Sequence, residues 1–355
     1  MNAKTIVELL KETFKEWQED KASRLAAALA YYTAFSIAPL IIIAIAIAAV
    51  VFGQEAAQGG IDEQLRGLLG QQGAEAIQEM IKNSRKPSEG TIATLISIVV
   101  LLFGASGVFG ELQDSLNTIW EVTPKPGQGV MTIIRNRFLS FAMVLGIGFL
   151  LLVSLLLSTI LAAVSNILGH MIPDLTILWS LLNFLISFGV ITVLFALIYR
   201  VLPDAEIAWG DVWIGSIITA LLFTIGKSLI GLYLGNSSIG STYGAAGSFV
   251  VFLLWVNYSA QILFFGAEFT QVYANKYGSR IVPTSNAVPV TEEARSQQGI
   301  PHTRTRNAVA SQNRIAQEVT TRRTMNRRRK RHPIAAFLGG LMGGTSRNRR
   351  NQRNR

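Results

Sequence analysis

LAAALAYYTAFSIAPLIIIAIAIAAVVFGQ, residues 25–54, contains no charged side chain and is the first of several such runs. The other uncharged runs lie at residues 90–110, 138–171, 175–199, 212–226 and 228–267. About 20 apolar residues in helical conformation cross the hydrocarbon core of a bilayer. Inside lipid every backbone N–H and C=O group must be paired within the protein, so each run should be an α-helix. The sequence therefore predicts an all-α, polytopic membrane protein.

These runs and the turns between them predict six transmembrane helices. The spans are expected at about residues 29–52, 91–109, 137–165, 176–199, 211–234 and 248–273. Pro39 should kink the first span, because it lacks a backbone donor and clashes with the preceding turn. Residues 54–89 are polar and helix-prone, which predicts a pair of short extramembrane helices. Because the number of spans is even, both termini should lie on one side of the membrane.

The distribution of lysine and arginine predicts which side that is. Cytoplasmic loops of membrane proteins carry an excess of these residues. With a cytoplasmic N-terminus, the outer loops contain only the four basic residues of segment 54–89, and every other loop lysine or arginine is inside. The sequence therefore predicts that both termini are cytoplasmic.

The net charge of +10 belongs to the C-terminal tail. Residues 281–355 contain 16 Lys and Arg against 3 acids, whereas residues 1–280 contain 16 against 19. The tail has little apolar surface to offset the entropy of ordering, so we expect it to be disordered. Its densest basic cluster consists of Arg327, Arg328, Arg329, Lys330 and Arg331. Such a cluster should bind anionic lipid headgroups. It would also attract nucleic acid non-specifically, but no specific nucleic-acid partner is expected, because no nucleic-acid-binding fold is evident.

The segment before the first span has the pattern of an amphipathic helix. Its apolar residues recur at spacings of three and four, with Lys and Glu between them: Ile6, Leu9, Leu10, Phe14 and Trp17. Such a helix can lie in the membrane interface, or it can pack under the bundle as a lead-in helix. The segment is too charged for a cleavable signal peptide and lacks the apolar core of one.

Lys227 is the charged residue that lies furthest inside a predicted span. A charge within a span costs about 2.5–3.5 kcal/mol on insertion scales and tends to mark function. Lys227 should lie about two turns, roughly 10 Å, from the outer end of its span. One interpretation is that its ammonium group snorkels to the outer headgroups. The other is that it binds an anionic substrate or a lipid phosphate, since no acid is predicted at the same depth.

Three polar residues share one face of the last predicted span. Asn257, Gln261 and Glu268 are spaced four and seven residues apart, so they should face the interior of the bundle. They would either form interhelical hydrogen bonds, each worth about 0.6 kcal/mol, or line a polar pathway. Glu111 and Asp114 lie at the inner end of the second span. Together with Arg200, Asp211 and Glu268 they are interpreted as a ring of ion pairs at the inner end of the bundle. The simpler role for such a ring is structural, as a belt that holds the helices together.

Four blocks of sequence resemble the YihY/BrkB family of bacterial inner-membrane proteins, whose older label is ribonuclease BN. The blocks are AAALAYYTAFSIAP (26–39), FGELQDSLNTIW (109–120), the segment from GDVW to GKSLIGLYLG (210–235), and the segment from YGAAGS to LLWVNYSAQILFFGAEFTQVYA (243–274). The resemblance covers roughly residues 10–275. It implies a six-helix protein of the bacterial cytoplasmic membrane with cytoplasmic termini, and it implies no substrate. In the second block and just before it, Gly104, Gly107 and Gly110 recur every third residue, which allows close helix approach.

Two classes of function remain after these observations, and a third is not expected. The first is a transporter or lipid-handling protein with a polar route through the bundle. The second is a scaffold without transport, whose basic tail binds anionic lipid or partners. Ribonuclease activity is not expected, because His170, His302 and His332 lack the clustering that metal-dependent or acid–base cleavage requires. The absence of cysteine excludes disulfides, thiol catalysis and Cys-ligated metals. No enzyme, cofactor or metal centre is predicted, and the sequence does not indicate an oligomeric state.

Overall fold

The structure is a computed structural model that describes residues 2–84, 91–127, 146, 176–236 and 246–302. The chain divides into two units, residues 1–290 and 291–355, and each is described by itself. The first unit contains helices α1 (Ala3–Glu19), α2 (Ala22–Phe52), α3 (Gln54–Ser84), α4 (Thr91–Ile119), α6 (Thr176–Val201), α7 (Trp209–Asn236) and α9 (Gly247–Lys276). Its short strands are β1 (Val122–Pro124), β2 (Ala205–Glu206), β3 (Val282–Pro283) and β4 (Ala287–Pro289). The second unit contains α10 (Glu292–Gln297).

Four helices in the described part of the chain are long and apolar enough to cross a membrane. They cover Ala22–Val50, Leu181–Val201, Trp209–Tyr233 and Gly247–Lys276. These match the predicted first, fourth, fifth and sixth spans, which confirms the prediction of an all-α membrane protein. The predicted second span lies within α4, and the predicted third span, 137–165, lies outside the described residues except for residue 146. The total of six spans therefore stays a prediction.

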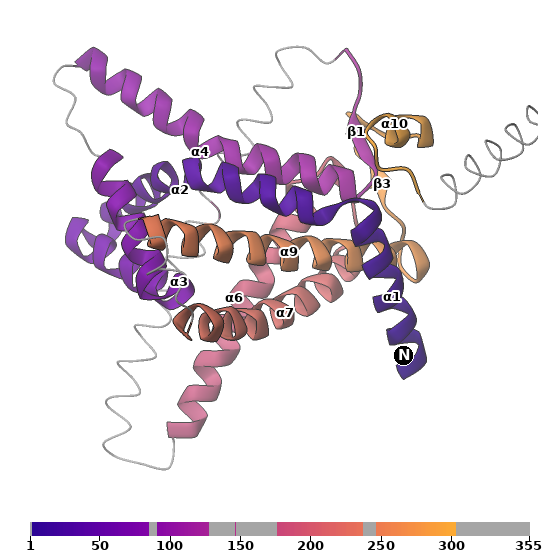
Figure 1. Cartoon of the computed structure of the whole chain (residues 1–355), viewed down its shortest axis with the longest axis horizontal. Helices are drawn as coiled ribbons and strands as arrows, with labels where there is room; N and C mark the ends of the chain where they lie inside the picture. The colour runs from indigo at the N-terminus through magenta and orange to yellow at the C-terminus, as the bar shows by residue number, and fades with distance from the viewer. Residues whose placement is uncertain (1, 85–90, 128–145, 147–175, 237–245, 303–355) are drawn as a thin grey trace, which may run out of the picture. The chain divides into compact units, whose positions relative to one another are not determined.

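Helix α9 is the central element of the first unit. It packs against α2 on one side and α7 on the other, and it also contacts α1 and α3 (Figure 1). Residues 266–272 of α9 are all buried, as expected for a helix segment surrounded by neighbours. Helix α4 packs against α2, and α6 packs against α7. The largest cluster of buried apolar side chains joins α2, α4, α6, α7 and α9.

Close helix crossings depend on small residues. A β-carbon at Gly215 of α7 would overlap Thr270 of α9, and one at Gly266 of α9 would overlap Thr219 of α7. Small side chains let two helix backbones approach closely where lipid supplies no hydrophobic driving force. The fully buried Tyr199 of α6 closes this crossing, since its hydroxyl donates a hydrogen bond to the Leu263 carbonyl oxygen over 2.7 Å.

A second close crossing joins α2 and α4. The Ser36 hydroxyl donates to the Gly104 carbonyl oxygen over 2.6 Å. A β-carbon at Gly104 would lie 3.3 Å from Pro39, and one at Gly107 would lie 3.2 Å from the Ser36 hydroxyl. The predicted close approach is confirmed at these two glycines, whereas Gly110 has nothing within 4 Å of such a carbon. Helix α2 continues through Pro39 without a break.

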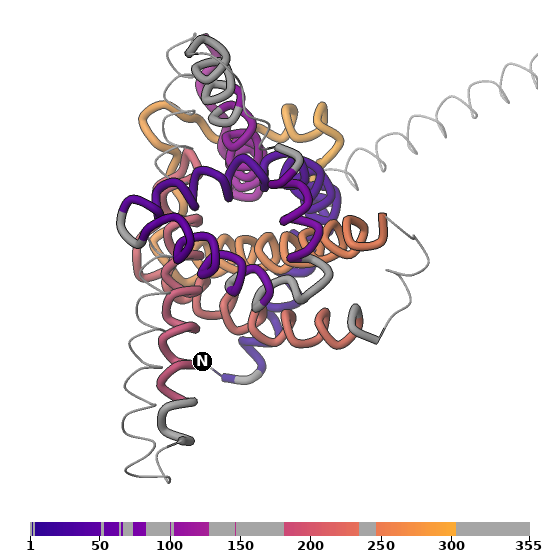
Figure 2. Tube along the Cα trace, turned by 90° about the vertical axis from the view of Figure 1, so that its left-hand side faces the viewer, coloured from indigo at the N-terminus to yellow at the C-terminus, as the bar shows by residue number. Residues whose placement is uncertain are grey.

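Helix α3 turns back on itself. Gln78 donates a hydrogen bond to Asp62, which is sixteen residues earlier in the same helical segment. In a straight helix these residues would be about 24 Å apart, so the segment must bend sharply between them. Figure 2 views the chain from the end at which α3 lies and shows this curl. The segment is thus one bent helix with two arms, where the sequence predicted a pair of short helices.

The segment after α9 corrects the prediction of disorder from residue 281 onward. Residues 281–290, here named the strap, pair with two separate loops: β3 is antiparallel to β2, and β4 is antiparallel to β1. The Lys125 ammonium group donates to the Ser285 carbonyl oxygen over 2.7 Å. The order comes from backbone partners that distant loops supply, which the polar composition of the tail does not reveal. Residues 303–355 lie outside the described residues, and so does the basic cluster 327–331.

Candidate functional site

A cavity of about 550 Å³ lies between α2 and the two arms of α3. Helix α2 contributes the side chains of Ile41 and Ile45, which are inside the first span and are buried. The arms of α3 contribute the rest of the lining: Gln58, Gly59, Ile61, Asp62, Leu65, Gln78, Ile81 and Lys82. The cavity therefore joins a membrane-spanning helix to the polar segment that follows it.

The lining of the cavity is amphiphilic. Ile41, Ile45 and Ile81 make part of its wall apolar, and they belong to a buried cluster that α2, α3 and α9 share. The polar part includes both an acid and a base, Asp62 and Lys82. Asp62 accepts a hydrogen bond from Nε of Arg66 over 3.0 Å, in addition to the bond from Gln78. These partners hold the carboxylate of Asp62 in place within the polar part of the cavity lining.

The chemistry of this lining is that of binding. Its polar groups are two amides, one carboxylate and one ammonium group. Charged and amide groups of this kind can hold a polar headgroup, and the isoleucine wall can hold an attached hydrocarbon chain. The lining contains no serine, threonine or histidine, so it offers no hydroxyl nucleophile with an adjacent imidazole base.

Sequence reasoning missed this cavity because it placed all candidate residues in the spans, at the inner ends of the spans or in the tail. A partial signal exists in segment 54–89, where Ile61 and Leu65 lie four residues apart, as do Ile77 and Ile81. That spacing predicts an apolar face on each arm of α3. The sequence does not show that the two faces meet α2, nor that they leave space between them.

Of the three residues in the predicted polar stripe of α9, two bond to each other. The Gln261 amide donates to Oδ1 of Asn257 over 2.8 Å, and both side chains are half-buried. Glu268 is two turns further along and fully buried, in the segment where α9 has neighbours on every side. None of the three lines the cavity between α2 and α3.

Lys227 lies on α7 with an exposed side chain. The preceding residue, Gly226, is buried, and a β-carbon there would lie 3.0 Å from the Tyr258 hydroxyl of α9. Lys227 is thus one residue past a close contact between two spans. Among the residues that the structure describes, no salt bridge to Lys227 is present.

At the other end of the bundle, hydrogen bonds hold two aspartates, Asp204 and Asp211, and the ring of ion pairs stays an interpretation. Asn117 donates to Oδ2 of Asp204 over 2.9 Å and accepts from the Asp204 backbone N–H over 2.8 Å. Asp211 accepts from both the backbone N–H and the hydroxyl of Ser279, over 3.0 and 2.9 Å. The guanidinium of Arg200 lies 5.9 Å from the centre of the Trp209 ring. Sequence reasoning missed Asn117 and Asp204, which are 87 residues apart and meet only in the folded chain.

Glu111 and Asp114 lie beside this hydrogen-bonded cluster, past the end of the predicted second span. Glu111 is half-buried, and desolvation raises the pKa of its carboxyl, with a further contribution from the Asp114 charge. Partial desolvation also raises the pKa of Asp114, although much of its side chain is exposed, and the Asp204 charge adds to this. Asp114 therefore lies close enough to repel both Glu111 and Asp204 when all three are ionised.

Known proteins resemble this chain over most of its length. A family model described as virulence factor BrkB matches residues 13–291. A UPF0761 membrane protein of Teredinibacter turnerae is 28% identical over 295 residues, which are 80% of this chain and 65% of that protein. One of Pseudomonas aeruginosa is 28% identical over 255 residues, which are 70% of this chain and 58% of that protein. One of Mannheimia succiniciproducens is 26% identical over 262 residues, which are 72% of this chain and 86% of that protein.

The matched part of this chain spans less than two thirds of the length of the first two relatives. The names of all three describe membrane proteins and state no activity or substrate. No solved structure matches the chain. Because the family model covers residues 13–291, the protein belongs to the BrkB family of membrane proteins.

Proposed function

We propose that this membrane protein binds an amphiphile with a polar headgroup in the cavity between α2 and α3, as a lipid-handling protein or transporter. The observation that carries the proposal is the pairing of an apolar wall on a spanning helix with charged and amide groups on α3. The volume of about 550 Å³ falls within the roughly 300–1,000 Å³ of small-molecule sites. A headgroup would occupy the α3 side, while its hydrocarbon chain would follow Ile41 and Ile45 into the bilayer.

The predicted orientation gives this cavity a location. With cytoplasmic termini, the first span leads outward and α3 lies on the outer side of a bacterial cytoplasmic membrane. The cavity would then take its ligand at the outer leaflet. The basic cluster 327–331 would bind anionic lipid on the inner side, where it would support the orientation without contributing to the cavity.

A scaffold without transport is the second candidate, and one observation favours it. The crossing of α7 and α9 is closed by Gly215, Gly266 and the fully buried Tyr199. Neither Lys227 nor Glu268 lines the cavity. The cavity therefore does not lead into the polar route through the bundle that the sequence suggested. A scaffold would have the same packed crossing and would bind no lipid specifically at α3.

Photo-crosslinking separates the two functions. The purified full chain would be reconstituted with a trace of a phospholipid whose acyl chain carries a diazirine, and labelled peptides would be identified by mass spectrometry. Labelling of the α2 and α3 peptides is expected. Ile45→Trp should fill the cavity and reduce that labelling about tenfold, which corresponds to ~1.4 kcal/mol of binding free energy.

The matched control is Ala46→Trp, which adds the same side chain one residue further along, on an exposed face of α2. It should leave labelling unchanged. Equal labelling of the native chain and Ile45→Trp would contradict the proposal and leave the scaffold as the better account.

A further inference from the structure

Helix α1 has an exposed apolar face that the cavity does not involve. Four large apolar side chains on this face are 40–51% exposed: Ile6, Val7, Leu10 and Phe14. At about 100° per residue these four positions fall within one side of the helix. Exposed apolar side chains that gather on one face mark an interaction surface, unlike the single ones that any protein surface carries.

Another side of α1 is fixed to the bundle. Leu9 is fully buried and clusters with Phe269 and Val272 of α9. The Lys276 ammonium group of α9 also lies 2.8 Å from Oε2 of Glu12. Because these contacts hold α1 in one rotation about its axis, the apolar face has a defined direction.

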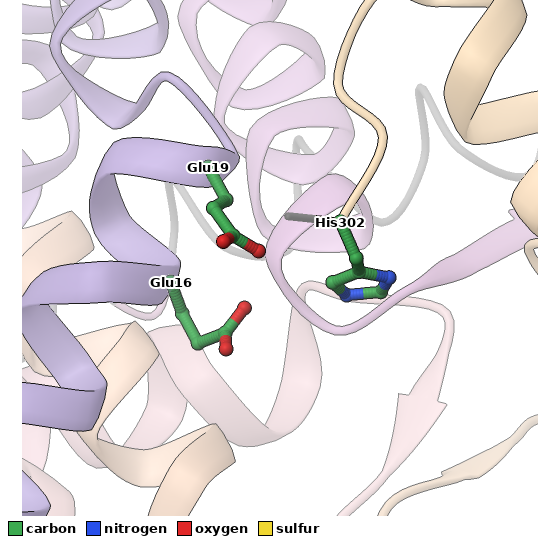
Figure 3. Close-up of side chains that lie close together, drawn as sticks. All are labelled: Glu16, Glu19 and His302. Carbon is green, nitrogen blue, oxygen red and sulfur yellow. The ribbon is translucent and has the colours of Figure 1, made fainter. Parts of the chain in front are cut away.

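The charges on α1 are sorted around the helix. The apolar face has Val7 at one edge. The helical spacing places three lysines along this edge: Lys4, Lys11 and Lys15. On the side opposite the apolar face it places three acids: Glu8, Glu12 and Glu19. Figure 3 shows Glu16 and Glu19 projecting from the same side of α1. Lysine stems beside an apolar face, with the acids turned away, match an anionic membrane surface.

The path of the chain places α1 at the level of that surface. Helix α1 ends at Glu19, and α2, the first span, begins only three residues later at Ala22. Lys21 between them adopts a left-handed conformation with φ of 54°, which redirects the chain. Figure 1 shows α1 at a steep angle to α2 and α9, across the end of the helices and not along them. A helix so placed lies beside the headgroups of the leaflet in which α2 begins.

We propose that α1 lies in the interface of that leaflet, with Ile6, Val7, Leu10 and Phe14 among the first acyl-chain carbons and its lysine edge against anionic headgroups. A second protein chain is a poorer occupant. Its surface would have to complement an apolar face bordered by lysines on one edge, whereas the lipids beside the first span are already in place. The proposal does not depend on a ligand in the cavity between α2 and α3.

Depth measurements with spin labels test this placement on the full chain, which has no cysteine of its own. Val7→Cys lies on the apolar face and Glu8→Cys lies about 100° further around α1, outside that face; each would be labelled in nanodiscs that contain phosphatidylcholine and phosphatidylglycerol. The label at residue 7 should collide mainly with oxygen, which partitions into lipid, and the label at residue 8 mainly with a water-soluble nickel chelate. Nickel access at residue 7 equal to that at residue 8 would overturn the proposal. So would protection of residue 7 from both reagents, since a protein would then cover the face.

The role of the lysines in binding anionic headgroups is tested with a second variant. Lys4→Gln with Lys11→Gln removes two lysines of the edge and leaves Leu9 and Glu12, which dock α1 on α9. In the native chain, replacing part of the phosphatidylcholine by phosphatidylglycerol should shift the collision ratio of the residue 7 label further toward oxygen. In the double variant this shift should be lost. A shift of the same size in both proteins would overturn the role of the lysines.

Discussion

Gly266 of α9 and Thr219 of α7 lie so close together that a β-carbon on the glycine would overlap the threonine side chain. Thr219 cannot withdraw easily, because its hydroxyl donates to the Gly215 carbonyl oxygen over 2.7 Å and also lies 3.0 Å from the Tyr199 hydroxyl. The glycine therefore sets the distance between two spanning helices. It also sets the position of the central helix α9, against which α1, α2 and α3 pack.

Gly266→Ala should consequently destabilise the protein. Overpacking of a well-packed interior costs about 1–3 kcal/mol, and this exceeds the roughly 0.5–1 kcal/mol that alanine gains over glycine within a helix. Thermal unfolding in detergent measures the difference. Gly231→Ala is the matched control, because Gly231 is exposed on α7 and has nothing within 4 Å of an added β-carbon. The control should be neutral or stabilising, and equal melting temperatures for the two variants would contradict the role of Gly266.

Asn117→Ala should loosen the strap. The substitution removes the acceptor of the Asp204 backbone N–H and one donor to the Asp204 carboxylate, and such buried losses cost about 1–3 kcal/mol. The Asp204 carbonyl oxygen in turn accepts from the backbone N–H of Thr284 in the strap. Faster cleavage by trypsin after the exposed Arg280 is therefore expected. Thr118→Ala is the control, since the Thr118 hydroxyl bonds only to the Asp114 carbonyl oxygen of its own helix in the contacts described. Cleavage of both variants at the native rate would show that Asn117 does not hold the strap.

Glu111→Gln should stabilise the protein in a pH-dependent manner. Because desolvation raises the pKa of Glu111 in the folded state, its ionisation destabilises that state. The penalty is absent below the ordinary pKa of a glutamate and grows as the pH rises through the folded value. The melting temperature of Glu111→Gln relative to the native protein should therefore increase between about pH 4 and pH 7.

Glu8→Gln is the control, because it removes a charge of the same sign from the exposed side of α1. A difference between Glu111→Gln and the native protein that is constant over this range would argue against desolvation as the cause.

Lys227→Met should leave lipid labelling at the cavity intact. The side chain is exposed on α7 and does not line the cavity, so we expect it to snorkel, and methionine suits lipid better than lysine. Lys227→Arg should be tolerated for the same reason. Loss of labelling in Lys227→Met, with partial retention in Lys227→Arg and normal insertion of both, would instead indicate that the charge holds an anionic group.

Long uncharged runs were sufficient to predict where the chain spans a membrane. The four candidate spans in the described residues match predicted ones, because run length is a local property and lipid permits only helices there. Close approach was also predicted correctly at Gly104 and Gly107 of α4, though not at Gly110, since a repeat every third residue places these glycines on a stripe. That stripe shows which helix face can approach a neighbour, and the structure adds that Ser36 and Pro39 of α2 are the neighbours.

Pairings between distant residues were not predictable in this way. The sequence interpretation of the inner end named Asp211 but neither Asn117 nor Asp204, and the structure shows that Asp204 bonds to Asn117 and that Asp211 bonds to Ser279. The start of the tail was assigned to disorder by composition, yet residues 281–290 find backbone partners on two loops. Composition reports how much apolar surface a segment can bury, and it does not report which other segments supply hydrogen-bond partners.

The sequence by itself determined that this protein is a helical membrane protein, where four of its spans lie, and that α1 is amphipathic, because each of these follows from the spacing of apolar residues along one segment. Only the tertiary structure decided where α3 bends back, which face of α1 docks on α9, and that α2 and α3 enclose a cavity. Those features depend on segments far apart in the chain coming together, and no local pattern encodes the distance between them.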